Sequence, residues 1–144
     1  MPMTPVIAVH LTAALAALAL GPVALWARRG HGRPGAAASP RPRLHRAAGY
    51  AWVSMMVLAA GSALFIRDRS LPNIAGYTPI HLLVPFTLGA LVLAFRALAR
   101  GDVRTHRKAM LQTYLGACVA AGLLTLLPSR TLGQLVWGQW LGWL

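Results

Sequence analysis

Four long apolar stretches make up most of the sequence, separated by segments that are polar or rich in glycine and proline. They cover residues 5–27, 47–66, 78–97 and 108–127. None has the polar face that a helix on the surface of a soluble protein shows. Each is long enough to cross a bilayer as a helix, which takes roughly 17–25 residues. The pattern predicts an all-α integral membrane protein. Its transmembrane domain, residues 1–130, is expected to form an up-down four-helix bundle.

A tryptophan-rich segment follows the last apolar stretch. Residues 131–144 are too few to cross the membrane again, and Trp137, Trp140 and Trp143 recur at every third position. Indole rings favour the membrane–water interface, where the ring lies in lipid and the N–H reaches water. We expect this tail either to lie at the interface or to dock on another subunit of a larger membrane complex.

Charge indicates how the bundle is oriented. The 144 residues are 57% hydrophobic, and 14 Lys and Arg stand against two acids, for a net charge of +12. All but three of the basic residues (Arg67, Arg69 and Arg130) fall between the first and second stretches or around the connection from the third to the fourth. Short basic loops stay in the cytoplasm. We therefore expect a multi-pass protein of the cytoplasmic membrane, with both termini on the outer side of that membrane. We therefore attribute the positive charge to the orientation of the helices in the membrane, and we expect no nucleic-acid partner.

Few residues in the stretches have side chains capable of chemistry. A single cysteine, Cys118, excludes an intramolecular disulfide and a cysteine-based zinc site. No carboxylate lies in the apolar stretches, which argues against a proton relay through Asp or Glu. Histidines are the ionisable groups that remain there.

Four of the five histidines form two pairs at two depths. His10 and His81 lie near the outer ends of the first and third stretches, and His45 and His106 lie at the inner ends of the second and fourth. Alternate helices of an up-down bundle face each other, so each pair is expected to meet across the axis. Helix packing or anchoring at the interface is the alternative for each histidine taken alone.

Paired histidines at these depths suit b-type haem, whose iron takes one imidazole nitrogen from each side. We expect one or two bis-histidine haems, with the outer pair holding the haem if there is only one. The small residues beside the histidines leave room for a flat macrocycle or for a neighbouring helix. The basic side chains of Arg46, Arg107 and Lys108 are expected to neutralise the propionates of the inner haem.

Two motifs open the second and fourth stretches. One is HRxxG, His45-Arg46-Ala47-Ala48-Gly49, and the other is GDxxxHRxxM, from Gly101 to Met110. With His10 and Gly21-Pro22 in the first stretch, the chain resembles a bacterial family of predicted four-helix membrane proteins of unknown function. The resemblance covers most of residues 5–127 and implies a protein of the bacterial inner membrane. The layout is also similar to diheme membrane cytochromes b, which is an analogy of architecture.

Two functions follow from these observations. The first is a membrane electron-transfer protein of cytochrome b type that exchanges electrons with a quinol or another membrane redox partner. The alternative is a non-catalytic accessory or assembly subunit of a larger membrane complex, with metal or haem handling as one such role. No residue is assigned to catalysis, and whether the protein is an enzyme is left open.

Overall fold

The computed structural model describes residues 4–28, 42–67, 74–128 and 131–143. The described part of the chain is helical apart from turns and one β-bridge between Ile74 and Tyr77, which confirms the all-α prediction. The helices are α1 (Pro5–Arg28), α2 (Pro42–Ala63), the 3-10 turn η1 (Pro79–Leu82), α3 (Leu83–Ala99), α4 (Val103–Thr113), the π-helical η2 (Tyr114–Ala120), α5 (Ala121–Thr125), α6 (Thr131–Gly133) and the π-helical η3 (Gln134–Trp140).

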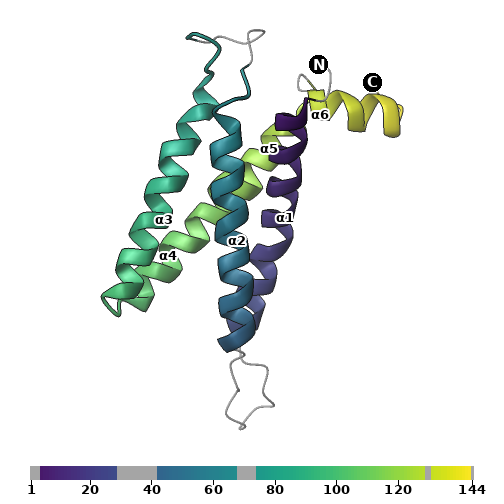
Figure 1. Ribbon diagram of the computed structural model, residues 1–144. Coiled ribbons are helices and arrows are strands. Elements are labelled where there is room, and N and C mark those ends of the chain that lie inside the picture. Colours follow the sequence, from purple (N-terminus) through teal and green to yellow (C-terminus); the bar gives the residue numbers. More distant parts are fainter. Residues whose placement is uncertain (1–3, 29–41, 68–73, 129–130, 144) are drawn as a thin grey trace.

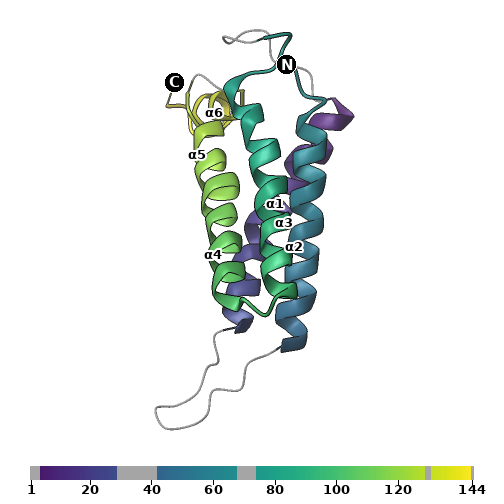
Figure 2. The ribbon, with the colours of Figure 1, turned by 90° about the vertical axis from the view of Figure 1, so that its left-hand side faces the viewer.

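The long helices form two antiparallel hairpins, side by side (Figures 1 and 2). In the first hairpin α1 packs along α2, and in the second α3 packs against α4, which continues through η2 into α5. Further contacts between α2 and α3, and between α1 and η2, connect the two hairpins. The start of α1 and the tail lie at one end of the molecule. The end of α1, the start of α2 and the α3–α4 turn lie at the other, which we call the basic end.

Small side chains fill the interior and large apolar side chains cover the outside. Buried positions include Ala13, Ala17, Ala60, Ala94, Ala97 and Ala109. In contrast, Leu15 is 57% exposed, and Val92, Leu93 and Leu123 are also more than half exposed. Small residues bring helix backbones close together in membranes, where the surface has no need to be polar. The packing therefore suits a surface in contact with lipid.

Among the described residues, two helical segments, Pro5–Ala27 and Pro79–Ala99, are long and apolar enough to span a membrane. The second and fourth predicted stretches differ from the helices that form. The helix α2 begins at Pro42, among arginines, and ends at Ala63, so that the last residues of the predicted stretch form a turn. The fourth helix begins at Val103 and takes a π-helical form from Tyr114.

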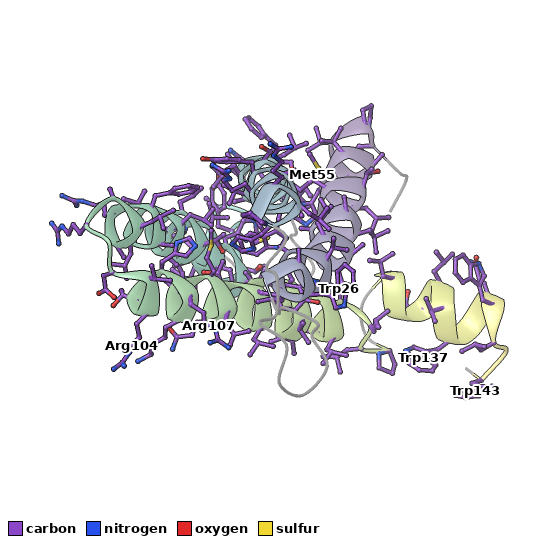
Figure 3. The ribbon with its side chains drawn as sticks, turned by 90° about the horizontal axis from the view of Figure 1, so that it is seen from below. Trp26, Met55, Arg104, Arg107, Trp137 and Trp143 are labelled. Atoms are coloured by element: carbon purple, nitrogen blue, oxygen red, sulfur yellow. The ribbon has the colours of Figure 1, made fainter. Side chains whose placement is uncertain are left out.

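The basic side chains gather as the sequence predicted. Those described near the end of α3 and the starts of α2 and α4 are all exposed: Arg43, Arg46, Arg96, Arg100, Arg104, Arg107 and Lys108. Figure 3 views the molecule from this end, with Arg104 and Arg107 labelled on α4. These charges therefore lie at one end of the helices, away from the large apolar surface.

The tail α6–η3 leaves the end of α5 and runs across the axis of the hairpins (Figure 1). The indole Nε1 of Trp137 donates a hydrogen bond to the carbonyl oxygen of Leu126 at 2.6 Å. The rings of Trp137 and Trp143 stack, with centroids 5.5 Å apart. Trp140 and Trp143 are 74% and 72% exposed. The tail thus presents indole rings at the end opposite the basic one.

An aspartate caps the start of α4. The carboxylate of Asp102 accepts a hydrogen bond from the backbone N–H of Thr105 at 2.9 Å. Gly101 before it has φ +75°, a conformation that glycine adopts without strain. Hydrogen bonds from Thr105, its side chain first and its backbone second, lower the pKa of Asp102. The cap places His106 one turn into α4.

We expect Asp102→Ala to lower the unfolding midpoint by about 2–4 °C at neutral pH, since it removes the cap. The pKa of Asp102 is lower in the folded state, so its contribution is fully present above the unfolded pKa of about 3.9 and disappears as the pH falls through the folded pKa. Thermal unfolding in detergent at pH 7 and at strongly acid pH measures this. An equal gap between Asp102→Ala and the unaltered protein at both pH values would contradict it.

Candidate functional site

A cavity of about 440 Å³ lies between the two hairpins, toward the basic end. All four long helices contribute to its wall, including Gly21 from α1, His45 and Gly49 from α2, Phe95 from α3 and His106 from α4. Its volume falls in the range typical of small-molecule and cofactor sites. The structure therefore brings the predicted inner pair of histidines to one cavity, which we call the histidine cavity.

Both of these histidines are fixed by a neighbouring backbone carbonyl. The Nδ1 atom of His45 lies 2.9 Å from the carbonyl oxygen of Ala24 in α1. The Nδ1 atom of His106 lies 3.0 Å from the carbonyl oxygen of Ala94 in α3. His106 is 8% exposed, and His45 is partly buried. Each imidazole is thus oriented by the helix next to its own.

The carbonyl contacts determine the tautomer. A carbonyl oxygen can only accept a hydrogen bond, so Nδ1 carries the proton in both rings. In the neutral ring Nε2 then keeps a free lone pair. Histidines that bind metals commonly donate their other ring N–H to a backbone carbonyl or a carboxylate in this way. His45 and His106 are therefore prepared to act as Nε2 ligands.

Two arginines complete the polar part of the wall. Arg46 follows His45 and Arg107 follows His106, and both line the cavity with exposed side chains. Lys108, the third cation that the sequence assigned to this site, is exposed and is not among the residues that line the cavity. The cavity therefore combines an apolar wall with two positive charges.

Trp52 closes another part of the wall and is 4% exposed. Its indole Nε1 is buried and makes no hydrogen bond of full geometry to a described residue. The sulfur of Cys118 lies beside it as a weak acceptor, while the Cys118 thiol donates to Sδ of Met56 at 3.2 Å. We therefore assign Trp52 a packing role, with its N–H directed toward Cys118.

The outer pair, His10 and His81, is arranged differently. His10 donates from Nδ1 to the carbonyl oxygen of Ala59 at 2.9 Å and lies 3.2 Å from Oγ of Ser62. Both partners belong to α2, so His10 faces α2, whereas the predicted arrangement has it facing the third helix. Neither His10 nor His81 lines the histidine cavity.

His81 lies in the turn η1, before the regular helix α3. Its Nε2 donates to the carbonyl oxygen of Ile66 at 2.9 Å, and its Nδ1 accepts the backbone N–H of Thr78 at 3.1 Å. The ring of Tyr77 also packs edge-on against it, at 5.1 Å between centroids. With both nitrogens occupied, His81 has no free ligand atom in this conformation. A haem between His10 and His81 stays a prediction without supporting contacts, and His31 lies outside the described residues.

The wall also contains Met110, the last residue of the second motif, and Tyr114, neither of which was predicted as a site residue. Met110 and Tyr114 follow His106 at intervals of four residues along the same helical face, and both line the cavity. Helical spacing from His106 could have indicated both residues. It could not have shown that the hydroxyl of Tyr114 bonds to a different helix, at the carbonyl oxygen of Leu18.

A comparison with protein families gives a match over most of the chain. A family described as "Predicted membrane protein (DUF2306)" matches residues 7–141. The chain belongs to this family. Membership makes it a membrane protein in contact with lipid, as its apolar surface indicates, and agrees with the resemblance to a membrane-protein family of unknown function. No curated protein and no solved structure gives a significant match.

Proposed function

We propose that the protein is a small membrane electron-transfer protein that holds one b-type haem between His45 and His106. One observation carries the proposal: two imidazoles from different hairpins line one cavity, each with its Nδ1 proton directed to a carbonyl. Such a pair presents two Nε2 lone pairs and no competing charge. This is the ligand set of a bis-histidine haem.

The rest of the cavity fits the same group. Gly49 leaves room in the wall, since a Cβ added there meets no atom within 4 Å, and Phe95 and Met110 provide apolar contact. In the part of the chain that the structure describes, no three His, Cys, Asp or Glu gather into a metal site. Two imidazoles would suit a haem iron, which needs two ligands from the protein, better than a tetrahedral metal, which needs four.

The residues have separable roles toward this group. His45 and His106 would hold the iron, while the positive charges of Arg46 and Arg107 would neutralise the propionates. The apolar wall keeps water from the ring. Bound in this way, a haem supplies one-electron oxidation and reduction, and the protein sets its potential through burial and through the carbonyls behind the histidines.

The proposal places the chain across the bacterial inner membrane four times. Exposed arginines at the basic end support a cytoplasmic location for that end, with both termini outside. The haem would then lie near the cytoplasmic face. A quinol or another membrane redox partner on one side, and an acceptor on the other, complete the electron path.

The alternative role, as an accessory or assembly subunit, is favoured by the tail. Trp140 and Trp143 project large exposed rings from a segment that lies across the helices. Exposed indoles suit either a lipid interface or a partner subunit. A haem-carrying subunit can also be a partner subunit, so this role is compatible with electron transfer.

The test is the absorption spectrum of the protein purified from membranes in mild detergent. We expect a reduced-minus-oxidised spectrum with b-type bands and a haemochrome assay close to one haem per chain. A content near two would show that the outer histidines also bind haem. A protein without bands, even after incubation with hemin, would contradict the proposal, and isolation only within a pigment-free complex would favour the accessory role.

A further inference from the structure

Pro22 interrupts the hydrogen bonding of α1 from within. In an α-helix the N–H of residue 22 would donate to the carbonyl of Leu18, but proline has no N–H. The helix is one of the two candidate membrane spans. Hydrocarbon offers no water to replace the missing donor, and an unsatisfied carbonyl there is costly. Leu18 therefore needs a donor from another helix.

Tyr114 provides that donor. Its hydroxyl donates to the carbonyl oxygen of Leu18 at 3.2 Å, which joins the first residue of η2 to the middle of α1. The tyrosine ring packs against Gly21, where a Cβ would overlap the ring atoms. Pro22 frees the carbonyl, and Gly21 makes room for the ring. We call this joint of Leu18, Gly21, Pro22 and Tyr114 the tyrosine clamp.

The clamp borders the histidine cavity, because Gly21 and Tyr114 both line it. It also connects the supports of the two histidines. The helix α1 carries the carbonyl of Ala24, which orients His45. The helix that contains Tyr114 begins with α4, which carries His106. A shift of α1 against α4 would therefore move one imidazole relative to the other.

We propose that Tyr114 is a positioning residue for the ligand of the histidine cavity. By tying α1 to the α4–η2 helix, its hydroxyl sets the mutual placement of His45 and His106. The proposal rests on the function proposed above, in which that ligand is haem. Its role goes beyond satisfying a carbonyl, and the two roles can be separated by changing Pro22.

The first measurement is a double-mutant cycle on stability in detergent. Tyr114→Phe removes the hydroxyl and leaves the Leu18 carbonyl bare, which should lower the folding equilibrium constant roughly fivefold. In a Pro22→Ala background the residue at 22 regains an N–H for Leu18. We therefore expect Tyr114→Phe to cost much less there. Equal costs in the two backgrounds would show that the clamp does not form.

The second measurement separates positioning from support of the backbone. We expect Tyr114→Phe and Tyr114→Phe/Pro22→Ala to keep their haem but to shift the midpoint potential in the same direction. The shift should change the ratio of reduced to oxidised haem at fixed potential at least about threefold, with an altered electron paramagnetic resonance signal of the ferric form. Pro22→Ala alone, which keeps the hydroxyl, is the matched reference.

The outcomes distinguish a positioning role of Tyr114 from simple support of the backbone. If the double variant regains both its stability and the original potential, the hydroxyl only satisfies a carbonyl and the positioning proposal is wrong. It is also wrong if Tyr114→Phe leaves the potential and the resonance signal unchanged while the unaltered protein carries haem. If the unaltered protein binds no haem, the proposed function fails first and the positioning role falls with it, whereas the stability cycle still reports on the clamp.

Discussion

His106→Ala should leave the purified protein with less than about a tenth of its haem. The change removes one of the two proposed iron ligands, and loss even of a group that only supports a metal ligand commonly costs 10- to 100-fold in affinity. Haem per chain, from the haemochrome assay and protein concentration, measures the loss. His45→Ala should have the same effect, because the iron would need both imidazoles.

Two controls distinguish the loss of an iron ligand from a general loss of folding. His106 is buried and bonded to the carbonyl of Ala94, so its replacement can also disturb folding. His45 is only partly buried, and circular dichroism of its alanine variant separates loss of haem from loss of helix. His10→Ala, at the opposite end, should keep the full haem content. The reverse result, in which His10→Ala loses haem and His106→Ala keeps it, would show that the haem binds at the outer histidines.

Gly49→Leu should exclude haem from a protein that is otherwise folded. Gly49 lines the histidine cavity, and a Cβ added there meets no atom within 4 Å. The leucine side chain therefore enters the cavity without a clash and occupies space that the macrocycle needs. We expect haem content to fall more than about tenfold. Stability should be unchanged or should rise by up to about 1 kcal/mol, since glycine is a poor helix former.

Gly61→Leu is the matched control for this variant. It lies on the same helix, a Cβ there also meets no atom within 4 Å, and it does not line the cavity. Both variants gain the same helix propensity, but Gly61→Leu should keep its haem. Haem content and thermal unfolding of the two variants are compared side by side. Equal haem in both would mean that the cavity is not where the haem binds.

Sequence patterns predicted the helical segments, though not their exact bounds, and they predicted that His45 and His106 lie at the same end of the molecule. Apolar stretches predicted helical segments, and basic connections predicted which helix ends lie together. His45 and His106 meet at one cavity because each opens a helix that starts at the same end. Ala13, Ala17 and Gly21, small residues spaced four apart on α1, are all buried.

The outer pair of histidines shows what the position of a residue along the chain cannot predict, which is the direction of its side chain. His10 and His81 have similar depths, but depth says nothing about the side to which a ring turns. His10 turns to α2, and the local turn before α3 captures His81 through Thr78. Such short-range hydrogen bonds compete with any partner across the bundle, and periodicity does not detect them.

The position of the histidine cavity between the hairpins has a consequence for biogenesis. Each hairpin is a contiguous piece of chain, and the cavity wall is complete only when both hairpins have met. A molecule that ligates His45 on one half and His106 on the other cross-links the halves and favours their association by mass action. Cofactor loading and the last step of assembly would then be a single event, so haem supply would govern how much mature protein accumulates.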